Sequence, residues 1–165
     1  LGRMIPAELP TVVQIVEQLV SQVMKELSDA VPWRPGVLEL LVALREAGLP
    51  QGIVTTSPRP MAAIVSDASP AGTFEFVVSG DDVNRDKPHP EPFLSAASQL
   101  GVKPANCVAI EDSPTGLASA VAAGVVPIGV PNDADLGEPA GWHLLTGLAG
   151  ITVADLERIV QRHHA

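Results

Sequence analysis

The sequence predicts an α/β fold in which helices cover both faces of a mostly parallel sheet. Short apolar runs of strand length alternate with helical patterns over most of the 165 residues, which is typical of β-α units with parallel strands. The apolar fraction of 46% and the charged fraction of 18% are those of a globular chain of about one domain. In such folds, ligands bind at the carboxyl ends of the strands.

The chain begins with two predicted helices. Thr11 is a plausible N-cap for the first, with Gln14 three positions later as in a capping box, and this helix should end before Pro32. Its apolar residues recur at intervals of three and four positions: Val12, Val16, Leu19, Val23 and Leu27. The second helix should take Pro35 as an early helical residue and stop at Gly48.

From residue 51 onwards, predicted strands alternate with predicted helices. The strands are 51–55, 74–79, 107–110 and 125–130, and the helices are 61–66, 92–100, 117–123 and 153–161. The runs 107–110 and 125–130 are compact and apolar, as expected of strands that are buried on both faces.

The composition excludes several classes of partner. A net charge of −9 without a run of lysine or arginine argues against nucleic acid. Cys107 is the only cysteine, so the chain can form neither a disulfide framework nor a cysteine metal cluster by itself. The longest apolar stretch, 116–130, is short for a membrane span and is cut by Gly124 and Pro127. We therefore expect a cytoplasmic protein that is not anchored to a membrane.

Two carboxylates directly follow one of the predicted strands. Glu111 and Asp112 come after the run 107–110 and should lie at the open edge of the sheet, where a hard cation such as Mg²⁺ takes oxygen ligands. A carboxylate in this position can also simply cap the next helix. The pair alone does not decide between these interpretations.

Hydroxyl groups and a lysine lie at two other junctions. Thr55, Thr56 and Ser57 close the strand 51–55, so their hydroxyls and amides could bind an anion or form an ordinary helix cap. Lys87 precedes a proline-rich stretch that leads into a helix, where its ammonium could bind phosphate or lie on the surface. Each signal is weak in isolation.

Four blocks in a fixed order strengthen these assignments. They are RPG at 34–36, IVTTSPR at 53–59, DKPHPEPF at 86–93 and IEDSPTG at 110–116. The series closely resembles the haloacid dehalogenase superfamily, in its phosphatase and phosphomutase branch with a helical cap inserted early in the chain. The resemblance covers nearly everything from Pro32 to about Val130. It implies a three-layer α/β/α core at 32–165 and the remnant of a helical cap at 1–31.

The resemblance implies a role for each matching residue. Thr55 would hydrogen-bond the transferring phosphoryl group, helped by the backbone of Thr56, and Lys87 would neutralise the charge that develops there. Asp112 would hold Mg²⁺. Glu111 would support the metal directly or through water, with Ser113 as an orienting hydroxyl.

The family's first motif is not found where the resemblance requires it. That motif is an apolar strand ending in Asp-x-Asp, whose first aspartate is the nucleophile and whose second is the general acid and base. No such strand precedes Thr55, and the similar Asp133-Ala-Asp135 comes after the Glu111-Asp112 block and is interpreted as a polar loop. The missing strand would be central, between the strand that ends at Thr55 and the one that ends at Ile110.

We therefore expect a piece of a longer enzyme that is inactive by itself. The intact protein is expected to be a Mg²⁺-dependent phosphatase that acts on a small phosphorylated metabolite through an aspartyl-phosphate. A sugar phosphomutase of the β-phosphoglucomutase type is the close alternative. A non-catalytic binding module and one half of a split enzyme are further possibilities.

Other conspicuous side chains receive structural interpretations. Arg59 and His89 could face a substrate but are more simply loop residues on the surface. His143 and the pair His163-His164 lack a partner at metal-ligand spacing, and the latter are taken as a frayed helix end.

Overall fold

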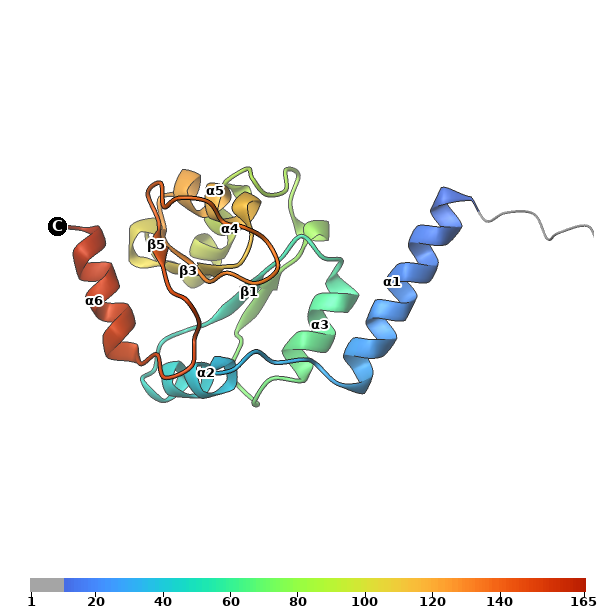
Figure 1. Ribbon diagram of the computed structural model, residues 1–165, viewed down its shortest axis with the longest axis horizontal. Helices are drawn as coiled ribbons and strands as arrows, with labels where there is room; N and C mark the ends of the chain where they lie inside the picture. Colours follow the sequence, from blue (N-terminus) through green and yellow to red (C-terminus); the bar gives the residue numbers. More distant parts are fainter. Residues whose placement is uncertain (1–10) are drawn as a thin grey trace, which may run out of the picture. The chain divides into compact units, whose positions relative to one another are not determined.

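The computed structural model describes residues 11–165, which belong to two compact units that divide after Pro32. The described part of the first unit contains one helix, α1 (Val12–Asp29) (Figure 1). Its capping box is present as predicted, because the Gln14 amide donates to Thr11 Oγ1 (3.2 Å) and the Thr11 amide donates to Gln14 Oε1 (2.8 Å). No residue of α1 is buried, and most of its apolar residues are exposed, among them Val12, Val16 and Leu19.

The second unit, Trp33–Ala165, alternates helices and strands as the sequence predicts. In chain order its elements are α2 (Val37–Glu46), β1 (Gly52–Val54), α3 (Arg59–Asp67), β2 (Phe76–Val78), the 3₁₀ turn η1 (Gly80–Asp82), α4 (Glu91–Leu100), η2 (Pro104–Asn106), β3 (Val108–Glu111), α5 (Pro114–Ala123), β4 (Val126–Gly129), β5 (His143–Leu144) and α6 (Val153–His163). All strand pairs are parallel.

The five strands form two separate sheets. Strands β1 and β2 pair with each other, and β3, β4 and β5 form the second sheet with β4 in the middle. Strand β4 is buried at all four positions, as expected of a parallel strand covered on both faces. Strands β1 and β3 pair on one side only, so each has one edge without a strand partner among the described residues.

Two apolar clusters form the core around β3 and β4. One cluster joins α2 and α6 to β4 through Leu40, Val126, Ile128, Val130, Leu156 and Ile159. The other joins α4 and α5 to β3 through Phe93, Ala109, Ala120, Ala123 and Val125. Because successive residues of the segment 125–130 point to opposite faces, it supplies both clusters. The core is therefore the three-layer α/β/α arrangement that the resemblance implies.

The start of α2 differs from the prediction. It begins at Val37, and Pro35 lies in the preceding turn, because Gly36 adopts a left-handed conformation with φ of 85°. A β-carbon at Gly36 would lie 2.3 Å from the backbone of Leu148. The neighbouring Arg34 donates to the carbonyls of Val130 (3.4 Å) and Pro131 (2.6 Å), which fixes this turn at the end of β4.

Two other helices also have different ends, and one strand was not predicted. Helix α5 begins at Pro114 rather than residue 117, because Ser113 caps it by accepting from the Gly116 amide at 3.0 Å. Strand β5 was not predicted, since two residues are too short to show periodicity. Helix α6 extends to His163, two residues beyond its predicted end. No helix in the described part of the chain is both long enough and apolar enough to cross a membrane.

Candidate phosphate and metal site

The carboxyl ends of β1 and β3 open into one pocket of about 410 Å³. Its lining comprises Val54, Thr55, Thr56, Lys87, Ile110, Glu111, Asp112, Ser113 and Thr115. All six residues that the sequence predicts for the site are in this set. They come from three segments, 55–56, 87 and 111–113, of which the first follows β1 and the third contains the end of β3.

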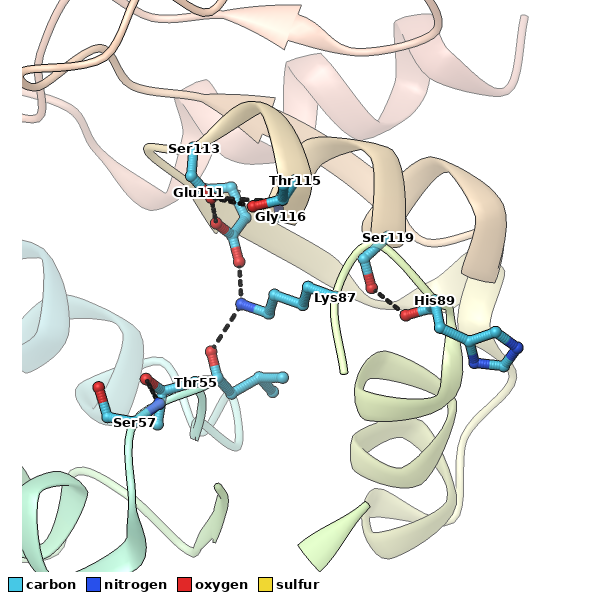
Figure 2. A network of polar contacts seen from close by, with 10 residues as sticks. Thr55, Ser57, Lys87, His89, Glu111, Ser113, Thr115, Gly116 and Ser119 are labelled. Atoms are coloured by element: carbon cyan, nitrogen blue, oxygen red, sulfur yellow. Dashed lines mark hydrogen bonds and ion pairs between the residues drawn. The ribbon is translucent and has the colours of Figure 1, made fainter. Parts of the chain in front are cut away.

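Lys87 lines this pocket and links the two sheets (Figure 2). Its Nζ donates to the Val54 carbonyl of β1 at 2.9 Å and forms an ion pair with Glu111 Oε1 at the end of β3. The Phe93 ring lies beneath the ammonium, with its centroid 4.9 Å from Nζ. The two charged side chains are only 7% and 9% exposed, so each depends on the other for compensation in a poorly hydrated place.

The loop that carries Lys87 is fastened to α5 by a buried hydroxyl. Ser119 is fully buried and donates to the His89 carbonyl at 2.6 Å. Within the loop, the His89 amide donates to the Asp86 carbonyl at 2.9 Å, and the Lys87–Pro88 peptide is cis. Ser119 therefore positions the backbone from which the Lys87 side chain extends (Figure 2).

Glu111 is held on both of its oxygens. While Oε1 pairs with Lys87, Oε2 accepts from Ser113 Oγ at 3.3 Å. A β-carbon at Gly116 would lie 1.9 Å from Oε2, so only glycine at that position leaves room for the carboxylate. The sequence alone indicates Glu111 as a metal-supporting residue and does not reveal its pairing with Lys87.

Asp112 differs from Glu111 in being exposed at the pocket. Among the described residues, no hydrogen bond or ion pair engages its carboxylate, so the oxygens can accept a cation. Mg²⁺ is commonly held by one or two carboxylates, with water and substrate phosphate completing its octahedron. The donor set of Asp112 with Glu111 beside it therefore fits that ion.

Thr55 and Thr56 present hydrogen-bond donors on the β1 side of the pocket. Thr55 Oγ1 accepts from the Ser57 amide at 3.1 Å, which leaves the hydroxyl hydrogen free to donate. The Thr56 amide has no hydrogen-bond acceptor in the part of the chain that the structure describes. A hydroxyl and an amide side by side, opposite a lysine, are suited to the oxygens of a phosphoryl group.

Comparison with known proteins shows the family of the chain. The sequence profile of the haloacid dehalogenase-like hydrolases matches residues 6–124, which is more than half of the chain. The chain belongs to this family.

Relatives of this haloacid dehalogenase-like chain include phosphoglycolate phosphatases. One from Shigella boydii is 35% identical over 136 residues, covering 81% of this chain and 53% of the relative. Another from Escherichia coli K12 is 38% identical over 105 residues, covering 63% of this chain and 42% of the relative. The chain thus spans about half the length of the curated relatives it matches.

Solved structures of the haloacid dehalogenase-like fold superimpose on most of the chain. CbbY from Rhodobacter sphaeroides in complex with phosphate has a TM-score of 0.79 and 29% identity, covering 94% of this chain and 72% of that one. A mutant of the same protein with xylulose-(1,5)bisphosphate has a TM-score of 0.76 and 27% identity, with the same coverage. A putative β-phosphoglucomutase from Thermotoga maritima has a TM-score of 0.70 and 26% identity, covering 94% and 71%.

Several polar residues noticed in the sequence lie elsewhere. Asp135 accepts from the Gly137 amide at 2.9 Å within a loop, and neither it nor Asp133 lines the pocket, in agreement with the prediction of a polar loop. Arg59 begins α3 and pairs with Asp82 at 2.5 Å. That hydrogen bond, followed by those from Ser79, holds the pKa of Asp82 far below its ordinary value.

His143 and His163 form a contact that their spacing in the sequence does not predict. His143 Nε2 lies 3.1 Å from His163 Nδ1, which joins β5 to the last turn of α6 across 20 positions. Burial, followed by the charges of His163 and Arg162, lowers the pKa of His143. The contact could not be predicted, since β5 itself was not. His163 is the last residue of α6, and His164 is its C-cap.

Proposed function

We propose that residues 33–165 form the phosphate- and magnesium-binding part of a phosphatase that hydrolyses a small phosphorylated metabolite. The observation that carries this proposal is the buried ion pair between Lys87 and Glu111, placed where the hydroxyl of Thr55 and the free carboxylate of Asp112 converge. A structural ion pair needs no such surroundings. A site for a phosphate dianion does, because both a cation and oriented donors stabilise its charge.

The proposed roles follow from what each side chain can donate or accept. Thr55 Oγ1 and the Thr56 amide donate to two non-bridging oxygens and orient the phosphoryl group. Lys87 donates from its ammonium and neutralises charge that develops as the phosphoryl group is transferred. Glu111 holds the ammonium in place, and Ser113 holds Glu111.

Asp112, with Glu111 beside it, is the proposed holder of Mg²⁺. When bound, the ion would supply positive charge against the phosphate and reduce its repulsion of an incoming carboxylate. The exposure of Asp112 leaves it open to such an ion, whereas the oxygens of Glu111 already have partners.

The proposed reaction also needs a nucleophile. Glu111 and Asp112 are the carboxylates that line the pocket among the described residues, and both are assigned to other tasks. We therefore assign the nucleophile to an Asp-x-Asp segment outside residues 11–165. Its first carboxylate would form a bond to phosphorus as the bond to the leaving oxygen breaks, and the second would protonate that oxygen. A water molecule, deprotonated by the second, would then release phosphate and regenerate the first.

Two substrate classes are compatible with the relatives. The phosphoglycolate phosphatases support a small phosphorylated acid, and the complex of CbbY with xylulose-(1,5)bisphosphate supports a sugar phosphate. The likeness to a putative β-phosphoglucomutase keeps phosphomutase as the second candidate. Both candidates use the same phosphate site, so they differ only in the fate of the phosphoryl group.

Phosphate binding by the chain itself tests the site. Isothermal titration with inorganic phosphate in the presence of Mg²⁺ should show affinity that falls about tenfold or more in Lys87→Met and Asp112→Asn, since each removes a charge that faces the anion or the ion. Lys103→Met and Asp67→Asn are matched controls, because both residues are exposed and lie outside the pocket. Equal losses in site and control variants would refute the assignment.

The reaction is tested once the chain is joined to a segment that carries Asp-x-Asp. Phosphoglycolate and a panel of sugar phosphates should release inorganic phosphate, with activity lost in Lys87→Met and Asp112→Asn. Isomerisation of a sugar phosphate without release of phosphate would replace the phosphatase with the phosphomutase.

A further inference from the structure

The turn η1 lies against the loop that joins β1 to α3, which we call the donor loop (residues 55–58). The Gly80 amide donates to the Ser57 carbonyl at 3.2 Å, and the Arg59 amide donates to Asp81 Oδ2 at 2.7 Å. Neither Gly80 nor Asp81 is among the residues that line the pocket. The turn therefore supports the donor loop from outside the pocket.

Gly80 also fixes the orientation of the peptide between Thr56 and Ser57. A β-carbon at Gly80 would lie 2.5 Å from the Thr56 carbonyl oxygen, so this oxygen packs directly against the glycine. The C=O and N–H of a trans peptide point in opposite directions. The N–H of the same peptide therefore faces away from Gly80, and it donates to Thr55 Oγ1 at 3.1 Å (Figure 2).

This peptide orientation decides what the Thr55 hydroxyl can do. Because Thr55 Oγ1 accepts from the Ser57 amide, its own hydrogen remains available to donate to a ligand. If the peptide were turned over, the Thr56 carbonyl would face Oγ1 and accept that hydrogen instead. Gly80 thus keeps the Thr55 hydroxyl as a donor without lining the pocket.

Asp81 supplies a cap that the local sequence of α3 cannot provide. The N-cap residue of α3 is Pro58, whose ring cannot accept a hydrogen bond, and Pro60 has no N–H to offer. The Asp81 carboxylate accepts from the Arg59 amide and places a negative charge at the helix N-terminus. The end of the donor loop is therefore held by a side chain 22 positions away from its partner.

The turn η1 is itself held in place. Ser79, fully buried directly after β2, donates to Asp82 Oδ2 from its amide at 2.8 Å and also from its hydroxyl. The Asp82 amide donates back to the Ser79 carbonyl at 3.1 Å. The donor loop and the turn also start from paired strands, since the Thr55 amide donates to the Val78 carbonyl at 2.9 Å. A turn fixed in this way can hold the donor loop in one conformation.

We infer that Gly80 and Asp81 are positioning residues for phosphate binding, which hold the donor loop in the conformation that presents the Thr55 hydroxyl and the Thr56 amide to the pocket. The identity of the ligand rests on the proposed function, whereas the contacts between η1 and the donor loop do not. Donors of a binding site need such support, because a displacement of about 0.5 Å already loosens the site.

Gly80→Ala tests the contact with the Thr56 carbonyl. Isothermal titration with inorganic phosphate in the presence of Mg²⁺ should show affinity reduced about tenfold, because the added carbon displaces the peptide that orients Thr55. Gly147→Ala is the matched control, since its β-carbon would meet no atom of the described residues within 4 Å and Gly147 does not line the pocket. Its phosphate affinity should equal that of the unmodified chain.

Asp81 is tested with a disruptive variant, a conservative variant and a control. Asp81→Ala should lower phosphate affinity about threefold to tenfold, because the donor loop loses a hydrogen bond. Asp81→Asn keeps an acceptor oxygen and should retain the affinity. Loss of a negative charge would by itself strengthen anion binding in both variants, so a loss in Asp81→Ala alone has a geometric cause. Asp155→Ala removes the carboxylate that completes the capping box of α6, and it should not change the affinity.

Amide hydrogen exchange without phosphate tests the support of the donor loop separately from its ligand. The Ser57 amide should exchange about tenfold faster in Gly80→Ala and Asp81→Ala than in the two controls, because its bond to Thr55 Oγ1 opens more often. Circular dichroism checks the folding of every variant. If Gly80→Ala does not fold, the Asp81 variants still decide the matter.

Three results would overturn the inference: unchanged phosphate affinity in folded Gly80→Ala and Asp81→Ala, an equal loss of affinity in Asp81→Asn, or unchanged exchange of the Ser57 amide. Failure of the proposed function has a different signature. The unmodified chain would then not bind phosphate, while the Ser57 amide would still exchange faster in both variants, which would refute phosphate as the ligand and support η1 as the element that holds the donor loop.

Discussion

Two ion pairs in this chain have similar chemistry and opposite surroundings. Lys87 and Glu111 are 7% and 9% exposed, whereas Arg59 and Asp82 are 53% and 28% exposed. Water screens the second pair, but the first must be compensated by its own partner. Burial, rather than opposite charge, therefore distinguishes the Lys87–Glu111 pair of the site from the Arg59–Asp82 pair, which joins α3 to η1.

The largest expected loss of stability comes from removing one partner of the buried Lys87–Glu111 pair. Glu111→Ala should lower the free energy of unfolding by about 3–5 kcal/mol, because it leaves the Lys87 ammonium buried without its counter-charge. The double variant Lys87→Met/Glu111→Leu should lose less than Glu111→Ala alone, since neither charge remains. Urea denaturation measures both. A double variant that is destabilised as much as Glu111→Ala, or more, would contradict strong coupling.

A smaller loss of stability is expected when the hydroxyl that positions the Lys87 loop is removed. Ser119→Ala leaves the His89 carbonyl without its hydrogen bond in a buried place, which should cost about 1–3 kcal/mol of unfolding free energy. Phosphate affinity should fall as well, because the backbone that carries Lys87 loses its anchor. Ser98→Ala on the exposed face of α4 is the matched control. Identical denaturation midpoints for the two variants would show that Ser119 does not anchor the loop.

The smallest loss of stability is expected when the exposed Arg59–Asp82 pair is removed. Arg59→Ala should lower the midpoint of urea denaturation at neutral pH only slightly, while the pKa of Asp82 rises towards its ordinary value of 3.8. It should stay below that value because Ser79 still donates to Asp82 through its amide at 2.8 Å. Carbon-13 NMR titration of the carboxylate measures this shift.

The sign of the pH dependence follows from the direction of that shift. A carboxyl whose folded pKa is depressed contributes stability above its ordinary pKa and loses it as the pH falls. The acid-induced loss of stability below pH 4 should therefore be smaller in Arg59→Ala than in the unmodified chain. An unchanged Asp82 titration would mean that Ser79 alone sets its pKa.

The sequence predicted the site residues because four blocks in a fixed order resemble one family, and each block lies at a junction between elements. Thr55, Lys87 and Asp112 each stand at the end of a strand or in the loop before a helix, and parallel topology brings such positions to one edge. Contacts that depend on packing could not be predicted from the sequence. The pairing of Glu111 with Lys87 spans 24 positions, and that of His143 with His163 spans 20.

The ends of elements were the least predictable feature, for local reasons. The left-handed Gly36 delays α2, and the Ser113 cap brings α5 forward. Strand β5 consists of two residues that are strand-like only because β4 lies beside them. None of these leaves a periodic pattern that a sequence can show.

By itself, the sequence determined the alternation of strands and helices and the layers of the core, because both depend on local periodicity and chain order. Four ordered blocks that resemble one family determined the residues that gather at the pocket. Only the tertiary structure decided which charges are buried together and which strand edges stay open. Burial and edge pairing are properties of neighbours in space, and these neighbours come from distant parts of the chain.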